Sequence, residues 1–121
     1  MRLIVINLVS KVVKLTNNFT LEELCHTDTG LLNIVPECYK VNLFKMALVL
    51  QKFRGYLNYE SLIDIPIFVS SCYRSTEVNQ AVSGTPNSKH RKGLAFDIYT
   101  PATDAICLFE YWIDFCDLLL R

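Results

Sequence analysis

The sequence has 121 residues, of which 51% are hydrophobic and 20% are charged, and its formal net charge is +0. This length predicts one domain, residues 1–121, with enough apolar side chains for a core. The balanced charge argues against nucleic acid as a partner and against an electrostatic membrane anchor. No apolar run approaches the roughly 18 residues that a transmembrane helix needs.

The first 15 residues are apolar and rich in β-branched side chains, which predicts a strand or an irregular arm. We expect no signal peptide, since no small-residue cleavage site follows, and therefore cytoplasmic synthesis; a degenerate signal peptide is the alternative. An odd number of cysteines without a CxxC pair favours free thiols over a disulfide framework. The five cysteines are Cys25, Cys38, Cys72, Cys107 and Cys116.

Two helices are predicted in the first half of the chain. Thr20 and Glu23 form a capping box that starts a short helix over residues 21–25. A long core helix is expected over residues 37–54, after Pro36 and ending at Gly55. Its predicted apolar face consists of Val41, Phe44, Ala47, Leu48, Leu50 and Phe53.

The second half predicts two strands and two helices. Residues 58–65 are expected to form a loop, followed by an apolar strand over 65–71. A short helix over 76–82, capped by Ser75, then leads into a loop over 83–93. Residues 94–100 alternate, with Leu94, Phe96 and Ile98 on one face, and Pro101 is expected to open a final helix over 102–115. The predicted fold class is α+β: a small antiparallel sheet carries the site on one face and packs against helices on the other.

His90 and Asp97 are the candidate metal ligands. A histidine in a loop and an aspartate on the adjoining strand can supply two of the three protein ligands of a catalytic zinc. Gly93 allows a tight backbone path between them. From spacing alone, the favoured interpretation is an exposed loop histidine and a turn or pairing carboxylate.

The surrounding pattern is more specific. Residues 88–97 read S-x-H-x-x-G-x-A-x-D, residues 73–88 contain YRS-x-EVN-x-AV-x-G-x-P-x-S, and residues 18–24 read NFTLEEL. From Asn18 onward, the chain resembles the zinc D-Ala-D-Ala carboxypeptidase family, which includes vancomycin-resistance D,D-peptidases and phage endolysins. It is most similar to the small single-domain branch of that family.

The resemblance implies a role for each matching residue. His90 and Asp97 would bind Zn²⁺, and Arg74 would stabilise the oxyanion that develops on the scissile carbonyl. Ser88 would hydrogen-bond the substrate near its carboxylate end. The implied substrate is a peptidoglycan stem peptide, cut next to a D-amino acid at the cell wall. Without the motif, Arg74 would be read as a structural ion pair and Ser88 as a turn serine.

The sequence departs from the family near its C-terminus. The family has a third ligand there, a histidine preceded by an acidic general base, on a strand that follows an apolar segment. Residues 115–121 correspond to that segment, so the resemblance predicts a C-terminal truncation, or completion by a partner chain or by self-association at an unpaired edge. The other histidine, His26, lies where the family has no ligand. Asp114 and Asp117 lie near the expected region, although solvated helix-end carboxylates would look the same.

Three functions follow from these features. The first is a zinc D,D- or L,D-peptidase. The second is a catalytically inactive homologue that acts as a cell-wall-binding or phage structural module. The third is a zinc-containing binding protein, by similarity to the Hedgehog signalling domain.

Overall fold

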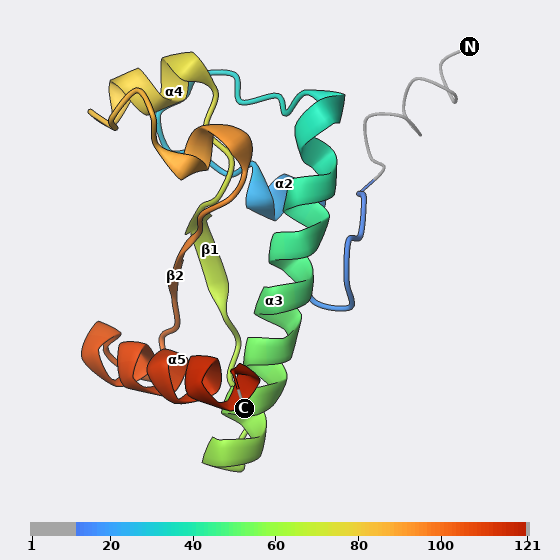
Figure 1. The fold of residues 1–121 in the computed structure, drawn as a ribbon, viewed down its shortest axis with the longest axis vertical. Helices are drawn as coiled ribbons and strands as arrows, with labels where there is room; N and C mark the ends of the chain where they lie inside the picture. The colour runs from blue at the N-terminus through green and yellow to red at the C-terminus, as the bar shows by residue number, and fades with distance from the viewer. Residues whose placement is uncertain (1–11, 121) are drawn as a thin grey trace.

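The computed structural model describes residues 12–120. The long helix α3 runs along the molecule with two strands beside it, α5 crosses one end, and α4 and the 3₁₀ turn η1 lie toward the other (Figure 1). This is the predicted α+β class. The predicted N-terminal arm covers residues 1–15, of which 1–11 lie outside the described residues. In chain order the elements are α2 (Leu21–Leu24), α3 (Glu37–Ser61), β1 (Phe68–Ser71), α4 (Thr76–Ala81), η1 (Lys89–Lys92), β2 (Asp97–Tyr99) and α5 (Ala105–Leu119).

The sheet consists of β1 and β2 in antiparallel pairing, with Val69 opposite Ile98. Val69 is buried and Ile98 packs against the core, whereas Asp97 and Tyr99 are exposed. The predicted alternation is therefore confirmed within β2, and one face of the sheet is open, but Leu94, predicted on the face of Phe96 and Ile98, precedes the strand and is 40% exposed. Both strands are shorter than predicted, because neighbouring backbone groups bond elsewhere: Ile65 donates to the Asn58 side chain and Leu94 to the carbonyl of Lys89.

Of the predicted apolar face of α3, Ala47, Leu50 and Phe53 are buried as predicted, and the other three residues are not. Val41, Phe44 and Leu48 are 56%, 44% and 41% exposed. Leu43 and Leu57 complete the buried face, whose five residues are spaced four, three, three and four apart and so lie on one side of the helix. Those fully buried residues are Leu43, Ala47, Leu50, Phe53 and Leu57.

The prediction that Gly55 ends the long helix is wrong, since α3 continues to Ser61. A glycine inside a helix costs about 0.5–1 kcal/mol relative to alanine. Burying Leu57, which has no exposed surface, contributes about 1.5–3 kcal/mol and offsets that cost. The helix ends only at Leu62, which adopts a left-handed conformation with φ 62°.

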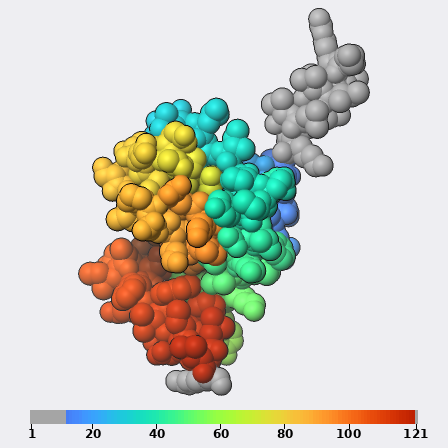
Figure 2. All heavy atoms as spheres, turned by 45° about the horizontal axis from the view of Figure 1, so that its top comes forward, coloured from blue at the N-terminus to red at the C-terminus, as the bar shows by residue number. Residues whose placement is uncertain are grey.

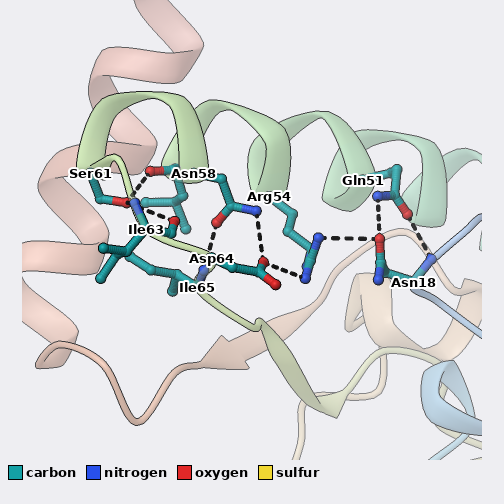
Figure 3. Close-up of polar contacts among 9 residues, drawn as sticks. Asn18, Gln51, Arg54, Asn58, Ser61, Ile63, Asp64 and Ile65 are labelled. Atoms are coloured by element: carbon teal, nitrogen blue, oxygen red, sulfur yellow. Dashed lines mark hydrogen bonds and ion pairs between the residues drawn. The ribbon is translucent and has the colours of Figure 1, made fainter.

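A row of polar side chains on α3 forms hydrogen bonds and an ion pair with the segment before α2 and with the segment before β1 (Figure 3). Gln51 exchanges hydrogen bonds with Asn18, whose side chain also accepts from Arg54. Arg54 pairs with Asp64 at 2.8 Å, and Asn58 donates to the same carboxylate. These bonds hold the segment before α2 and the segment before β1 against one face of α3.

The final helix begins later than predicted. Pro101 lies in a turn, and α5 starts at Ala105, because the Asp104 side chain caps it by accepting from the backbone N–H of Cys107 at 2.8 Å. Phe53 of α3 packs edge-on against Trp112 of α5, with ring centroids 5.1 Å apart. Within residues 12–120, none of the helices combines the length and apolar character that a membrane crossing requires.

Candidate metal centre

The candidate site forms where β1 ends, η1 turns and β2 begins. Arg74, three residues after β1, donates its backbone N–H to the carbonyl of His90 at 2.9 Å. Ser88 caps η1 by accepting from the backbone N–H of His90. Gly93 ends η1 with φ +70°, where a Cβ would lie 2.7 Å from the Leu43 side chain. The backbone therefore needs glycine there to bring His90 toward β2.

The imidazole of His90 points at the carboxylate of Asp97. Its Nε2 lies 3.5 Å from Asp97 Oδ2, and its Nδ1 lies 2.8 Å from the carbonyl oxygen of Cys72. A carbonyl only accepts, so in the neutral ring Nδ1 carries the hydrogen and Nε2 keeps its lone pair. The ring side chain is only 11% exposed, and the carbonyl fixes its orientation.

This pair fits two positions of a zinc centre. Two ligands of a tetrahedral zinc, each about 2.0–2.2 Å from the metal, lie roughly 3.4 Å apart, close to the observed 3.5 Å. A carbonyl on the second histidine nitrogen is also the usual way a zinc-binding imidazole is oriented. In the part of the chain that the structure describes, no group of three His, Cys, Asp or Glu side chains could hold a metal. The described residues thus offer two candidate ligands, His90 and Asp97.

Arg74 lies beside the pair and is held at each guanidinium nitrogen. Its Nη2 lies 3.4 Å from Asp97 Oδ2, its Nε donates to the Ser71 hydroxyl, and its Nη1 donates to the side chain of Asn79. The Arg74 side chain is 16% exposed, so a fixed positive charge stands at the edge of the histidine–carboxylate pair. The Asp97 carboxylate contacts both the His90 imidazole and the Arg74 guanidinium. Such a cluster can bind a metal ion and, next to it, an anionic oxygen.

Comparison with known families bears on this arrangement. Residues 17–112 match the family model described as Peptidase M15. The chain belongs to the Peptidase M15 family. That family is generally zinc-dependent, and membership places the chain among the metallopeptidases. Comparisons with curated proteins and with solved structures gave no significant match.

Two groups in this M15 site have no role in the sequence-based interpretation. Asn79 is 2% exposed and orients Arg74, and the Cys72 carbonyl orients His90. Asn79 belongs to the EVN stretch of the motif, so a buried polar role could have been inferred for it. The Cys72 carbonyl belongs to the backbone, so its contact with His90 cannot be inferred from a pattern of side chains.

Gly84 makes room for Asn79, which gives a testable prediction. A Cβ on Gly84 would lie 2.1 Å from Asn79 Oδ1, and the Asn79 amide already donates to the Thr85 carbonyl. We expect Gly84→Ala to lower the free energy of unfolding by about 1–3 kcal/mol, measured by urea denaturation. Gly55→Ala is the matched control. Its Cβ meets nothing within 4 Å, and in mid-helix it should stabilise the fold by about 0.5–1 kcal/mol. If Gly84→Ala and Gly55→Ala changed the free energy of unfolding equally, the close contact between Gly84 and Asn79 would be contradicted.

The remaining candidate residues lie around or away from the pair. Ser88 lines a hollow of about 440 Å³ together with Arg74, Lys89, Arg91 and Lys92. His26 pairs instead with Asp28 at 3.0 Å. Asp114 and Asp117 lie on α5, at the end of the molecule away from α4 and η1 (Figure 2).

Burial makes two thiols of the M15 domain resistant to ionisation. Desolvation raises the pKa of Cys72 to about 12 and that of Cys25 to about 11, from an ordinary value of 9.0. Cys38 and Cys107 are exposed. At pH 7.5 we expect Ellman's reagent to modify Cys25 and Cys72 at least ~100-fold more slowly than these two.

The same shifts give a pH dependence of stability. Between pH 9 and about 11, the folded state keeps thiol protons that the unfolded state releases. The free energy of unfolding should therefore fall as the pH rises through this window. Equal labelling rates at Cys38 and Cys72 in the folded protein would refute the burial on which both expectations rest.

Proposed function

We propose that this M15 chain is a zinc peptidase that cleaves peptidoglycan stem peptides next to a D-amino acid, as a D-Ala-D-Ala carboxypeptidase or a phage endolysin. The observation that carries the proposal is the 3.5 Å approach of His90 Nε2 to Asp97 Oδ2 beside the Arg74 guanidinium. Family membership supports the metallopeptidase chemistry. The motifs over residues 73–97 support the substrate class, and with it synthesis in the cytoplasm and action at the cell wall.

Each side chain of the site would have a separate role in the reaction. His90 and Asp97 would hold zinc, which when bound polarises a carbonyl and lowers the pKa of water. Arg74, kept in place by Ser71 and Asn79, would stabilise negative charge on the scissile carbonyl oxygen. Ser88 would hydrogen-bond the substrate carboxylate, in a hollow whose lysine and arginine side chains favour an anion.

The proposed centre needs a third ligand and a general base. The described residues form a two-stranded sheet, so the second edge of β2, beside Asp97, carries no strand there. A strand added at this edge would place its side chains next to the pair. Residues 1–11 and 121 contain no His, Cys, Asp or Glu. We propose that a strand of a partner chain supplies the missing groups at this edge.

A second function is favoured by the same two-ligand arrangement. A chain that keeps the fold, the cleft and Arg74 but lacks proton-transfer chemistry would act as a cell-wall-binding or phage structural module. In that case zinc would bind weakly or not at all, while binding to cell-wall peptide would persist.

One experiment separates the two functions. The full chain is loaded with zinc, its metal content is measured by plasma mass spectrometry, and release of D-alanine from diacetyl-L-Lys-D-Ala-D-Ala is followed. One zinc per chain with D-alanine release supports the peptidase. Retention on purified peptidoglycan without zinc or release supports the binding module. A chain that binds neither zinc nor peptidoglycan would overturn both proposals.

A further inference from the structure

A long groove runs along the open face of the sheet toward Arg74. Its larger part, about 800 Å³, lies over β1 and the end of β2 and is bordered by α2 and the following loop. Its smaller part, about 330 Å³, reaches Ser71 and Arg74. His26, Asp28 and Ser70 line both parts, so the two parts adjoin. The smaller part is also lined by Arg74, whose guanidinium lies 3.4 Å from the Asp97 carboxylate at the edge of the candidate metal centre.

The floor of the groove is aromatic. Phe68 of β1 and Tyr99 of β2 lie opposite each other with ring centroids 5.5 Å apart. They are 42% and 55% exposed, although large apolar side chains on a sheet are usually covered. A pair of exposed rings suits the methylene stem of a long side chain, and its quadrupole attracts a cation.

The wall of the groove is acidic. Glu22, Glu23 and Asp28 line the larger part, all from α2 and the loop after it. Among the residues that line the larger part, Arg54 is the one permanent cation, and its guanidinium is paired with Asp64 at 2.8 Å. Arg74, which lines the smaller part, is paired with Asp97 at 3.4 Å. In the larger part, three carboxylates against one paired cation leave a negative potential along this wall.

We propose that this groove binds an extended peptide through a primary-amine side chain, and so selects the substrate of the peptidase. The proposal rests on the function proposed above. The methylene stem of the side chain packs on Phe68 and Tyr99, and its ammonium group lies against Glu22 and Asp28. The peptide backbone then continues past Ser70 to Arg74, where the scissile amide is held. Charge complementarity with Glu22, Glu23 and Asp28 favours this occupant over an acidic peptide, and Arg74 at the end of the smaller part places the bound peptide beside the metal centre.

The test uses two synthetic peptides, Ala-D-γ-Glu-Lys-D-Ala-D-Ala with a free lysine amine and the same peptide with that amine acetylated. Acetylation removes the charge and keeps the stem. We expect the full chain to bind the free-amine peptide at least tenfold more tightly in isothermal titration calorimetry. The Glu22→Gln/Asp28→Asn double variant should reduce the preference to less than twofold. Each amide keeps an oxygen acceptor for the partner that the carboxylate has now, the Val13 N–H and the His26 ring.

Glu60→Gln, at an exposed position on the last turn of α3 that lines no part of the groove, is the matched control and should keep the full preference. Equal affinity for the two peptides, no binding of either, or a preference that survives in the double variant would overturn the proposal. So would a second copy of the chain or a divalent ion occupying the groove in its place. Because the readout is binding, a preference without hydrolysis would refute the peptidase and keep the groove. Equal hydrolysis of both peptides would support the peptidase and refute selection by the groove.

Discussion

Replacing His90 with alanine should weaken zinc binding by about 100-fold or more, because even the outer partners of a metal-binding histidine change affinity by about 10- to 100-fold. The imidazole is 11% exposed, the Cys72 carbonyl holds one ring nitrogen, and the other lies 3.5 Å from Asp97. Alanine removes one ligand of the pair and leaves the carboxylate alone. Competition with a zinc-chelating dye measures the change.

The sequence provides a matched control, since it contains two histidines. His26→Ala removes the other imidazole, which is paired with Asp28, and should leave zinc affinity within about twofold of the wild type. Circular dichroism checks that both variants fold. If His90→Ala binds zinc as tightly as the wild type, or if His26→Ala is the variant that loses it, the ligand assignment is wrong.

Replacing Arg74 with alanine should leave zinc bound and lower kcat by about 100-fold or more, the usual effect of removing one donor to a developing oxyanion. The guanidinium is pre-positioned by Ser71 and Asn79, so it requires no reorganisation when negative charge appears on the substrate. The loss should fall on kcat more than on KM, since the interaction strengthens in the transition state. Steady-state kinetics of the zinc-loaded chain, with zinc affinity measured in parallel, test this prediction.

Two further variants serve as controls for the Arg74→Ala measurement. Arg74→Lys keeps the charge but cannot reach Ser71, Asn79 and Asp97 together, so it should recover only part of the activity. Lys45→Ala removes an exposed cation on α3 and should change kcat by less than about twofold. An Arg74→Ala chain that hydrolyses substrate at the wild-type rate would assign Arg74 a structural role only.

The parts of the fold that could be predicted from sequence depend on local chemistry. Thr20 and Ser75 accept hydrogen bonds from the third residue of their helices, as capping residues do, and both helices begin where the pattern places them. His90 and Asp97 meet because a short loop that starts at Gly93 joins η1 to β2, and the motif spacing already contains this arrangement. These features need only neighbouring residues, so a single sequence reveals them.

The parts that could not be predicted depend on distant partners. Gly55 looks like a helix end until Leu57 is known to be buried, and Pro101 looks like a helix start until the Asp104 cap is seen. The groove is less visible still, because its walls come from α2, β1 and β2. The aromatic pair of Phe68 and Tyr99 forms only when the strands align in their observed register.

We propose that His90 and Asp97 bind one divalent ion beside Arg74. Crystals of the chain soaked in zinc and measured at the zinc absorption edge test it most directly. We expect an anomalous peak about 2.0–2.2 Å from both His90 Nε2 and the Asp97 carboxylate. A peak at other side chains, with the His90 and Asp97 side chains unliganded, would contradict the account.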